Sequence, residues 1–278
     1  MQWVTRPRRP PPPRETVIST HHRPVAVVTG ASSGIGAEFA ARFAARGYDL
    51  VLVARRRDRL EDLAGRLADA HGAASTVVVA DLADPGGPDD VARQIRSHGL
   101  LVDALVNSAG FGTYGPFVDE DPARVAAEIQ VDVTAVTLLS RLLLPDLVAS
   151  RAGILVNVAS TAAYQPGPWF AVYAASKAYV LSLTEALWAE HRGSRLRVLA
   201  LSPGPAETEF FDVAGTDRFR IGQVLTVAQI VDVAFRSLDR RYPPPSVVTG
   251  LRNAVTAAVS GAAPTRLVVR VASRLARG

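Results

Sequence analysis

Thr29-Gly30-Ala31-Ser32-Ser33-Gly34-Ile35-Gly36 is the stretch of sequence that decides the fold of this chain. An apolar, β-branched run precedes it, and a helical pattern follows it. Glycines at this place let the backbone turn tightly and approach a pyrophosphate, whose charge is met by the amides and the positive dipole end of the next helix. Because the turn stands between a strand and a helix, we interpret it as a dinucleotide-binding turn; the alternative is a simple strand-to-helix connection.

The rest of the chain alternates short apolar runs with Ala/Leu/Arg segments of helical period. Several runs are apolar on both faces, as expected for parallel strands that helices cover on both sides. The sequence therefore predicts an α/β fold in three layers, a doubly wound, seven-stranded parallel sheet with helices on both faces. The expected strands are Val25–Thr29, Asp49–Ala54, Thr76–Ala80, Ala104–Asn107, Ile154–Ala159, Arg197–Ser202 and Val247–Thr249, and the expected helices are Gly34–Arg46, Arg57–His71, Pro88–Ser97, Pro122–Ser150, Val172–His191 and Val227–Arg240.

Composition divides the chain into three segments. Residues 1–24 carry five arginines against Glu15, a balance of +4 out of the net charge of +5, and contain a run of prolines. We expect them to form a disordered, Pro/Arg-rich leader. Residues 25–250 are expected to form a single domain. The whole chain beyond the leader carries a net charge of only +1, so no nucleic-acid partner is expected. The leader lacks the apolar run of a secretory signal, so we expect a cytoplasmic protein.

The third segment, residues 251–278, is expected to be a helical extension. Its arginines recur every three or four positions with apolar residues between them, which predicts a basic amphipathic helix. The first interpretation is that this helix packs against the body or a second subunit. The alternative is a peripheral contact with an anionic membrane surface, because the apolar stretch is far shorter than the roughly 20 residues that a membrane span requires.

The chain contains no cysteine, which excludes disulfides, thiolate metal ligands and a cysteine nucleophile. Its five histidines are scattered, and no pair of them has the spacing and acidic neighbours of a metal site. We therefore expect no bound metal.

Lysine occurs once, at Lys177, four residues after Tyr173. Residues four apart on a helix share a face, so the phenol and the ammonium are expected to lie side by side. A lysine is a compact point charge that can lower the pKa of a neighbouring phenol, whereas an arginine has a planar fork. The pair is a candidate acid/base group; the alternative is a surface Tyr and Lys on an exposed helix.

Arg55 and Arg56 follow the second expected strand, about 20 residues beyond the glycine turn. An NAD-binding fold usually carries an acidic residue here for the ribose 2′-hydroxyl, whereas a 2′-phosphate calls for arginine. The sequence therefore predicts NADP(H). Asp81-Leu82 closes the third strand, where a carboxylate can hold the adenine amino group, and Asn107-Ser108-Ala109-Gly110 closes the fourth.

These motifs, together with Ser160 and Pro203-Gly204, stand in an order that resembles the short-chain dehydrogenase/reductase family, whose members have a Rossmann fold. The resemblance runs from about Val25 to about Thr208 and is looser beyond. It implies an NADP(H)-dependent oxidoreductase that interconverts a carbonyl and an alcohol. The implied catalytic residues are Asp132, Ser160, Tyr173 and Lys177, and the implied cofactor-binding residues are Gly30, Ser32, Ser33, Gly34, Ile35, Gly36, Arg55, Arg56, Asp81, Leu82, Asn107, Ala109, Gly110, Tyr173, Lys177, Pro203, Gly204 and Thr208.

Within this resemblance, Tyr173 exchanges a proton with the substrate oxygen, Ser160 holds that oxygen, and Lys177 binds the nicotinamide ribose. Two residues depart from the family pattern. Asp132 stands where members commonly carry an asparagine that supports a water relay to the lysine, and Ser108 stands where a second asparagine is common. If Asp132 is ionised, it offsets part of the pull of Lys177 on Tyr173; if it is protonated, the relay survives.

Aromatic residues near the expected loops suggest a lipophilic ketone, aldehyde or secondary alcohol as substrate, the alternative being that several are lid or core residues. The resemblance also implies a homodimer or homotetramer built on the helices Pro122–Ser150 and Val172–His191. Two other functions stay open, a nucleotide-binding regulatory protein without turnover and a sugar-nucleotide epimerase or dehydratase. The aromatic residues are Phe111, Tyr114, Trp169, Phe170, Phe210, Phe211 and Phe219, with Arg218 and Arg220 as candidate carboxylate clamps.

Overall fold

The computed structural model describes residues 23–210, 214–215 and 222–277 of the chain. Its centre is a seven-stranded sheet in the order β3-β2-β1-β4-β5-β6-β7, and all neighbouring strands are parallel, as the sequence predicts. The chain order reverses direction between β1 and β4, and ligands of open α/β sheets bind at such a switch point. The strands are β1 (Val25–Thr29), β2 (Asp49–Ala54), β3 (Ser75–Val79), β4 (Ala104–Asn107), β5 (Ile154–Val158), β6 (Arg197–Ser202) and β7 (Ser246–Val248).

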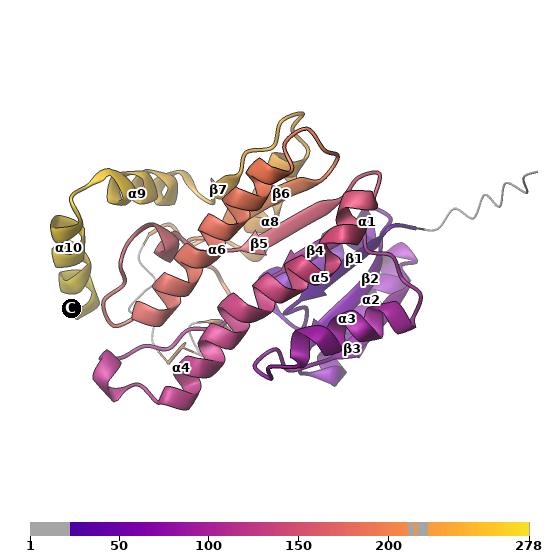
Figure 1. Cartoon of the computed structure of the whole chain (residues 1–278), viewed down its shortest axis with the longest axis horizontal. Coiled ribbons are helices and arrows are strands. Elements are labelled where there is room, and N and C mark those ends of the chain that lie inside the picture. The colour runs from indigo at the N-terminus through magenta and orange to yellow at the C-terminus, as the bar shows by residue number, and fades with distance from the viewer. Residues whose placement is uncertain (1–22, 211–213, 216–221, 278) are drawn as a thin grey trace, which may run out of the picture.

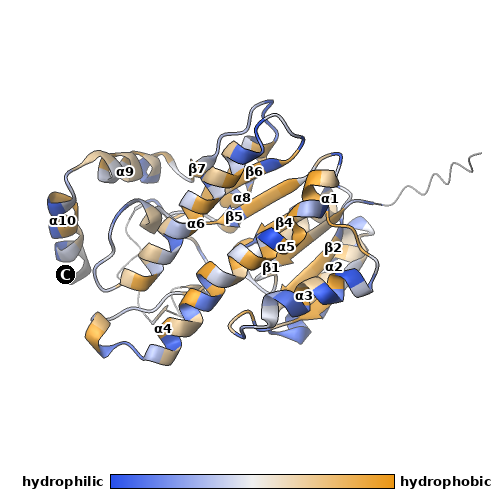
Figure 2. Cartoon of the chain, viewed as in Figure 1, coloured by the Kyte–Doolittle hydropathy of each residue, from blue (hydrophilic) through white to orange (hydrophobic). Residues whose placement is uncertain are grey.

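Helices cover both faces of the sheet (Figures 1 and 2), and a large apolar core lies on each face. On one face, α1 (Gly34–Ala45), α2 (Arg57–His71) and α8 (Val227–Leu238) pack on the strands, with the rings of Phe43 and Phe235 5.1 Å apart. The other face carries α3 (Gly87–Ser97), α5 (Val136–Ala149) and α6 (Ala171–Glu190). All five residues of β1 are buried, because this strand lies between both cores.

The helix expected over Pro122–Ser150 is interrupted. It consists of α4 (Pro122–Ile129), a π-helical segment η2 (Gln130–Ala135) and α5. Single π turns inside α-helices occur frequently at functional sites, because they change which side chains face inward. Here the π segment contains Asp132, whose side chain is fully buried.

At the two ends of the domain the structure differs from the boundaries expected from the sequence. Arg23, which we placed in the leader, donates from Nε to the carbonyl of Gly47 at 3.0 Å and lies 3.6 Å from the Asp49 carboxylate. It therefore belongs to the folded body, whereas residues 1–22 lie outside the described part. Strand β7 begins at Ser246, one residue before the expected start, and the amide of Thr249 instead bonds to Ser202 O at 3.1 Å.

After β7 the chain forms two further helices, α9 (Leu251–Ala262) and α10 (Thr265–Arg277), which meet at a sharp angle and extend beyond the end of the sheet (Figure 1). Asn253 anchors the start of this arm, because its side-chain amide bonds to the carbonyls of Thr249 at 2.9 Å and Gln223 at 3.0 Å. The extension is thus helical, as expected, and consists of two helices, the second of which carries the basic amphipathic pattern. Within the described ranges, every helix is too short or too polar to pass through a bilayer.

Candidate active site

The glycine turn after β1 lies at the carboxyl edge of the sheet. Gly30 has a φ of +67°, and a Cβ there would come within 2.9 Å of the Ala109 backbone after β4. A glycine is therefore required for the two strand ends to meet. Ser33 precedes α1 without capping it through its side chain, so the first-turn amides of α1 keep their capacity to bind an anion. This cradle fits a pyrophosphate.

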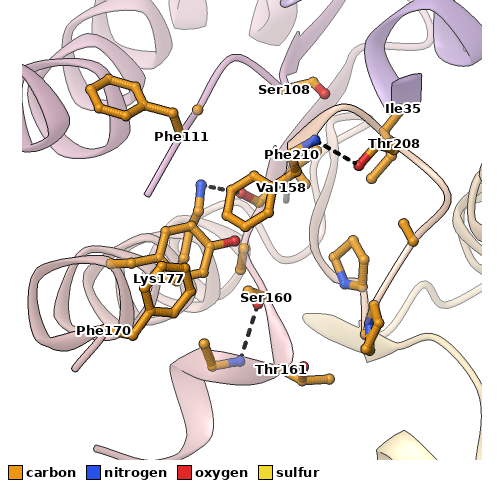
Figure 3. A pocket seen from close by; sticks show the side chains of 18 of the residues that line it. Ile35, Ser108, Phe111, Val158, Ser160, Thr161, Phe170, Lys177, Thr208 and Phe210 are labelled. Atoms are coloured by element: carbon orange, nitrogen blue, oxygen red, sulfur yellow. Dashed lines mark hydrogen bonds between the residues drawn. The ribbon is translucent and has the colours of Figure 1, made fainter. Parts of the chain in front are cut away.

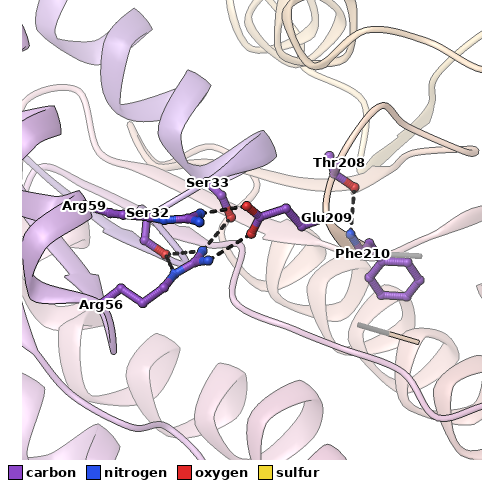
Figure 4. A network of polar contacts seen from close by, with 7 residues as sticks. All are labelled: Ser32, Ser33, Arg56, Arg59, Thr208, Glu209 and Phe210. Carbon is purple, nitrogen blue, oxygen red and sulfur yellow. Dashed lines mark hydrogen bonds and ion pairs between the residues drawn. The ribbon is translucent and has the colours of Figure 1, made fainter. Parts of the chain in front are cut away.

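A polar network lies beside this turn, at the end of β2 (Figure 4). The Arg56 guanidinium donates to Ser32 Oγ at 2.9 Å and to Ser33 Oγ at 3.0 Å. Arg55, in contrast, points outward with 73% of its side chain exposed, 3.8 Å from Asp81. Of the two arginines that the sequence singled out, Arg56 is the one joined to the glycine turn.

The residues after β3 and β4 take different positions. Asp81 and Leu82 line the same cleft as the glycine turn, and Asp81 Oδ1 accepts from the Ala83 amide at 2.9 Å. Asn107 is absent from the cleft lining and donates instead to Asn157 Oδ1 at 2.8 Å and to Ser140 Oγ at 3.1 Å. Its side chain thus joins β4 to β5 and α5 and acts on the cleft only through the backbone that follows it.

The candidate catalytic groups converge on the cleft from β5 and α6 (Figure 3). Tyr173 and Lys177 lie one turn apart on α6, with Lys177 Nζ 5.5 Å from the centroid of the phenol ring. Lys177 also donates to the carbonyl of Val158 at 3.3 Å. Ser160 follows β5 and accepts from the Ala162 amide at 3.1 Å, which starts the short 3-10 helix η3 (Thr161–Tyr164). The helical spacing therefore brings the phenol and ammonium together as predicted.

Asp132 lies directly beneath this pair. Its Oδ2 is 3.1 Å from Lys177 Nζ, and its Oδ1 accepts from the Phe111 amide at 3.1 Å. A Cβ on Gly110 would come within 2.9 Å of Asp132 Oδ1 and 3.1 Å of Lys177 Nζ, so the chain after β4 packs closely over both charges. The acid is therefore a direct ion-pair partner of Lys177, where we considered only contact through water.

Burial and charge act against each other in this group. Burial raises the pKa of Tyr173, and the Lys177 ammonium and a hydrogen bond with Ser160 offset only part of that rise. Burial also works against the charge of Lys177, but attraction to Asp132 and Tyr173 outweighs it, so the pKa of Lys177 is raised. The lysine thus stays charged and pulls the phenol's pKa in the predicted direction, without bringing it below its usual value.

A second buried acid, Glu128, lies one helical turn before Asp132. Its Oε2 accepts from the Thr113 amide at 2.9 Å and from the Thr113 hydroxyl at 2.6 Å. Its Oε1 is buried and has no hydrogen-bond partner within the described structure. Burial raises the pKa of Glu128 to about 7, and the neighbouring Asp132 adds to the rise while the Thr113 bonds oppose it. Sequence reasoning missed this residue.

The cleft has a volume of about 760 Å³ and a mostly apolar wall away from the glycine turn. Phe111, Phe170 and Phe210 line it, and the Phe210 ring lies 5.1 Å from that of Tyr173. Tyr114 and Trp169 are absent from the lining, while Phe211, Arg218, Phe219 and Arg220 lie outside the described residues. The other expected residues of the site, Gly34, Ile35, Gly36, Pro203, Gly204 and Thr208, all border the cleft.

The arm formed by α9 and α10 closes the far end of the cleft. Apolar side chains of both helices border the cleft, although Leu267 and Val271 on α10 are 53% and 48% exposed. The membrane alternative gains no support. An amphipathic pattern was the only signal in the sequence, and it does not say which surface the helix covers. The arm contributes Val255, Val259, Leu267, Val268 and Val271 to the lining.

Comparison with known proteins gives the family. The sequence profile described as short chain dehydrogenase matches residues 24–218. A short chain dehydrogenase of Pseudocercospora fijiensis is 34% identical over 186 residues, which span 66% of this chain and 60% of the relative. The very-long-chain 3-oxoacyl-CoA reductase of Anas platyrhynchos is 32% identical over 184 residues, which span 64% of this chain and 58% of the relative. The chain belongs to the short-chain dehydrogenase family of oxidoreductases.

A solved structure shows the same fold. The short-chain dehydrogenase from Sphingobium yanoikuyae, in complex with NADPH, superposes with a TM-score of 0.75 at 36% identity, covering 89% of this chain and 95% of that one. The matched regions span only about three fifths of the length of the two curated relatives above. Rossmann architecture and family membership thus agree with the sequence prediction.

Proposed function

We propose that the protein is an NADP(H)-dependent oxidoreductase that interconverts a lipophilic carbonyl compound and its alcohol, with Tyr173 as the acid/base group. The observation that carries the proposal is the joint placement of Ser160, Tyr173 and Lys177 at a cleft whose other end is a pyrophosphate cradle. Such a cleft brings a coenzyme and a carbonyl compound to the same phenol.

The coenzyme fits the residues present. In this proposal the glycine turn and the N-terminus of α1 hold the pyrophosphate, Asp81 contacts the adenine, and Arg56 binds the 2′-phosphate; their shared position along the cleft supports these roles. The solved relative that carries NADPH supports this choice of coenzyme. When bound, the nicotinamide supplies or accepts the hydride.

The residues of the chain handle the proton. In the reducing direction the Tyr173 phenol donates its proton to the substrate oxygen, and Ser160 donates a hydrogen bond to the same oxygen. In the oxidising direction Tyr173 must ionise, which burial disfavours and the Lys177 charge favours. Asp132 keeps Lys177 charged through the 3.1 Å ion pair, while its own negative charge raises the pKa of Tyr173 and offsets part of the lysine's effect.

The substrate class follows from the wall opposite the glycine turn. Aromatic rings from the loops and aliphatic side chains from α9 and α10 line it, and no charged side chain of the arm belongs to the lining. An apolar wall of this extent favours a long or bulky apolar substrate. The relative from Anas platyrhynchos, a very-long-chain 3-oxoacyl-CoA reductase, supports this class.

The test is to measure turnover with a panel of apolar ketones and aldehydes, using the absorbance of NADPH or NADH as the readout. We expect oxidation of NADPH in preference to NADH, and a loss of on the order of a hundredfold to ten-thousandfold in kcat for Tyr173→Phe, because a positioned proton donor contributes that much. Coenzyme binding by Tyr173→Phe, measured by fluorescence titration, serves as the folding control. Undiminished turnover in this variant would remove Tyr173 from the reaction.

A second copy of the chain is the proposed partner. The outer side of α4, η2 and α6 carries a shallow apolar depression lined by Ile129, Val133, Val172 and Tyr179, with 43% of Ile129 and 42% of Tyr179 exposed. These are the helices on which we expect a homodimer or homotetramer. Replacing Ile129 with aspartate and measuring molar mass by light scattering tests this, and an unchanged mass distribution counts against it.

A further inference from the structure

Glu209 occupies the polar network beside the glycine turn (Figure 4). Its Oε2 accepts from Arg56 at 3.0 Å, and its Oε1 accepts from Arg59 at 2.7 Å. Glu209 comes from the loop after β6, so the contact with Arg56 joins residues 153 positions apart in the chain. Neither Glu209 nor Arg59 was expected from the sequence to belong to this site.

The donors around this carboxylate form an anion site. Arg56 donates to the oxygens of Ser32 and Ser33, which leaves both hydroxyl hydrogens to point at a bound anion. Two guanidinium groups and two hydroxyls suit a phosphate, which has three acceptor oxygens, better than a planar carboxylate with two. The site lies where the proposed function places the coenzyme's 2′-phosphate.

The Glu209 carboxylate is a permanent anion at this site. Hydrogen bonds with Arg59 and Arg56 lower its pKa to about 2, so it is charged at every pH at which the enzyme would work. About 40 to 44% of each of the three side chains is exposed. The ion pairs are therefore weak enough to be exchanged, since exposed pairs contribute little to stability.

We propose that Glu209 is a built-in competitor for the 2′-phosphate: its carboxylate fills the anion site of Arg56 and Arg59 in the free protein and leaves when the phosphate binds. A phosphate monoester carries a charge of about −1.5 to −2 against −1 for the carboxylate, so it displaces Glu209 from the two arginines. A coenzyme without this phosphate leaves Glu209 in place. The inference rests on the proposed NADP(H) preference and adds the residue that sets its strength.

The next residue in the chain borders the other end of the cleft. Phe210 follows Glu209 directly, and its ring lies 5.1 Å from that of Tyr173 and 6.2 Å from that of Phe170. The anion site and the apolar end of the cleft thus receive side chains from adjacent residues of one loop.

The experiment is calorimetric titration of the full chain with adenosine 2′,5′-bisphosphate and, separately, with adenosine 5′-monophosphate. Glu209→Gln keeps the shape of the side chain but removes its charge. We expect the variant to bind the bisphosphate about threefold to tenfold more tightly, because the ligand no longer has to displace two exposed ion pairs of ordinary strength. Binding of the monophosphate should change by less than about twofold, since that ligand leaves the site to Glu209.

Glu207→Gln is the matched control. Glu207 is exposed and lies two residues before Glu209, so this substitution removes the same charge outside the anion site. We expect no preferential gain for the bisphosphate in this variant. An unchanged affinity in Glu209→Gln, or an equal gain in Glu207→Gln, overturns the competitor role while leaving the coenzyme proposal standing. If neither the parent nor Glu209→Gln prefers the bisphosphate to the monophosphate, both the competitor role and the NADP(H) preference fall.

Discussion

Two glutamates of this protein, Glu128 and Glu209, lie in regions of opposite character. Glu128 is fully buried beside Asp132 and has neutral donors from Thr113, and its pKa rises to about 7. Glu209 is partly exposed between two arginines, and its pKa falls to about 2. The pKa of a glutamate thus shifts in opposite directions at two places in one molecule.

The difference shows what decides the charge of an acid in this fold. Burial removes water from a carboxylate and favours the neutral form unless a cation is close. The single cation of the buried group, Lys177, already pairs with Asp132 at 3.1 Å, so a second negative charge at Glu128 is left uncompensated. At the surface, water and two arginines support the charge of Glu209, and each contact can be exchanged at low cost in free energy.

The largest expected effect comes from removing the cation of the buried group. Lys177→Met leaves Asp132 buried without its partner, so we expect the free energy of unfolding to fall by about 3–5 kcal/mol near neutral pH. The loss should shrink in acid, where Asp132 takes up a proton. Chemical denaturation at several pH values measures both effects.

Arg59→Met is the surface counterpart of that substitution and should reduce stability by less than about 1 kcal/mol. The double variant Lys177→Met with Asp132→Asn should recover part of the loss, because the uncompensated charge is gone. Equal losses of stability in Lys177→Met and Arg59→Met would contradict the distinction between the buried and the exposed groups.

Glu128→Gln should remove a pH dependence of stability. The pKa of Glu128 is about 7 in the folded protein against 4.5 for an unperturbed glutamate. Between these values the unfolded chain has lost the proton that the folded chain keeps, so the free energy of unfolding falls as the pH rises and levels off above about 7. Relative to the parent, we expect Glu128→Gln to gain about 3 kcal/mol between about pH 4 and pH 8.

Glu209→Gln controls for the loss of a glutamate charge. The pKa of Glu209 is lowered in the folded protein. Its contribution to the free energy of unfolding is therefore present above pH 4.5 and is lost as the pH falls toward 2, the reverse of Glu128. Urea unfolding curves collected across the pH range distinguish the two variants. A parallel pH dependence in Glu128→Gln and the parent protein would show that Glu128 is not held in its protonated form.

The smallest expected effect is that of salt on exposed ion pairs. Arg46 holds Asp239 through two bonds of 2.8 and 3.0 Å at the surface. A double-mutant cycle on this pair should give a coupling below about 1 kcal/mol in dilute buffer and close to zero in 1 M salt, where the Debye length is about 3 Å. The cycle on Lys177 and Asp132 should change little with salt, and an equal decline in both cycles would argue against their different solvation.

Much of the fold follows from local patterns in the sequence. Each strand is a short apolar run, and five of the six expected helices form as single helices with one face packed on the sheet, whereas Pro122–Ser150 is interrupted. Tyr173 and Lys177 were predictable as neighbours because helix geometry alone brings them together. Their raised pKa values were not, since these depend on burial by elements distant in the chain.

The missed residues show where local reasoning ends. On α4, Glu128 is buried while the adjacent Ile129 is 43% exposed, the reverse of what polarity predicts. Only the docking of Thr113 onto this helix explains the inversion. Glu209 reaches Arg56 and Arg59 across about 150 residues of sequence, a distance at which no periodicity carries information.

The arm of α9 and α10 has a consequence for how such an enzyme can diversify. The proposed acid/base residues all precede β6, whereas the arm that lines the far end of the cleft begins after Gly250. Because Asn253 holds the start of the arm to Gln223 and Thr249, a different segment placed there would have to keep this anchor. A change confined to this segment would alter one wall of the cleft and leave the proposed acid/base residues in place.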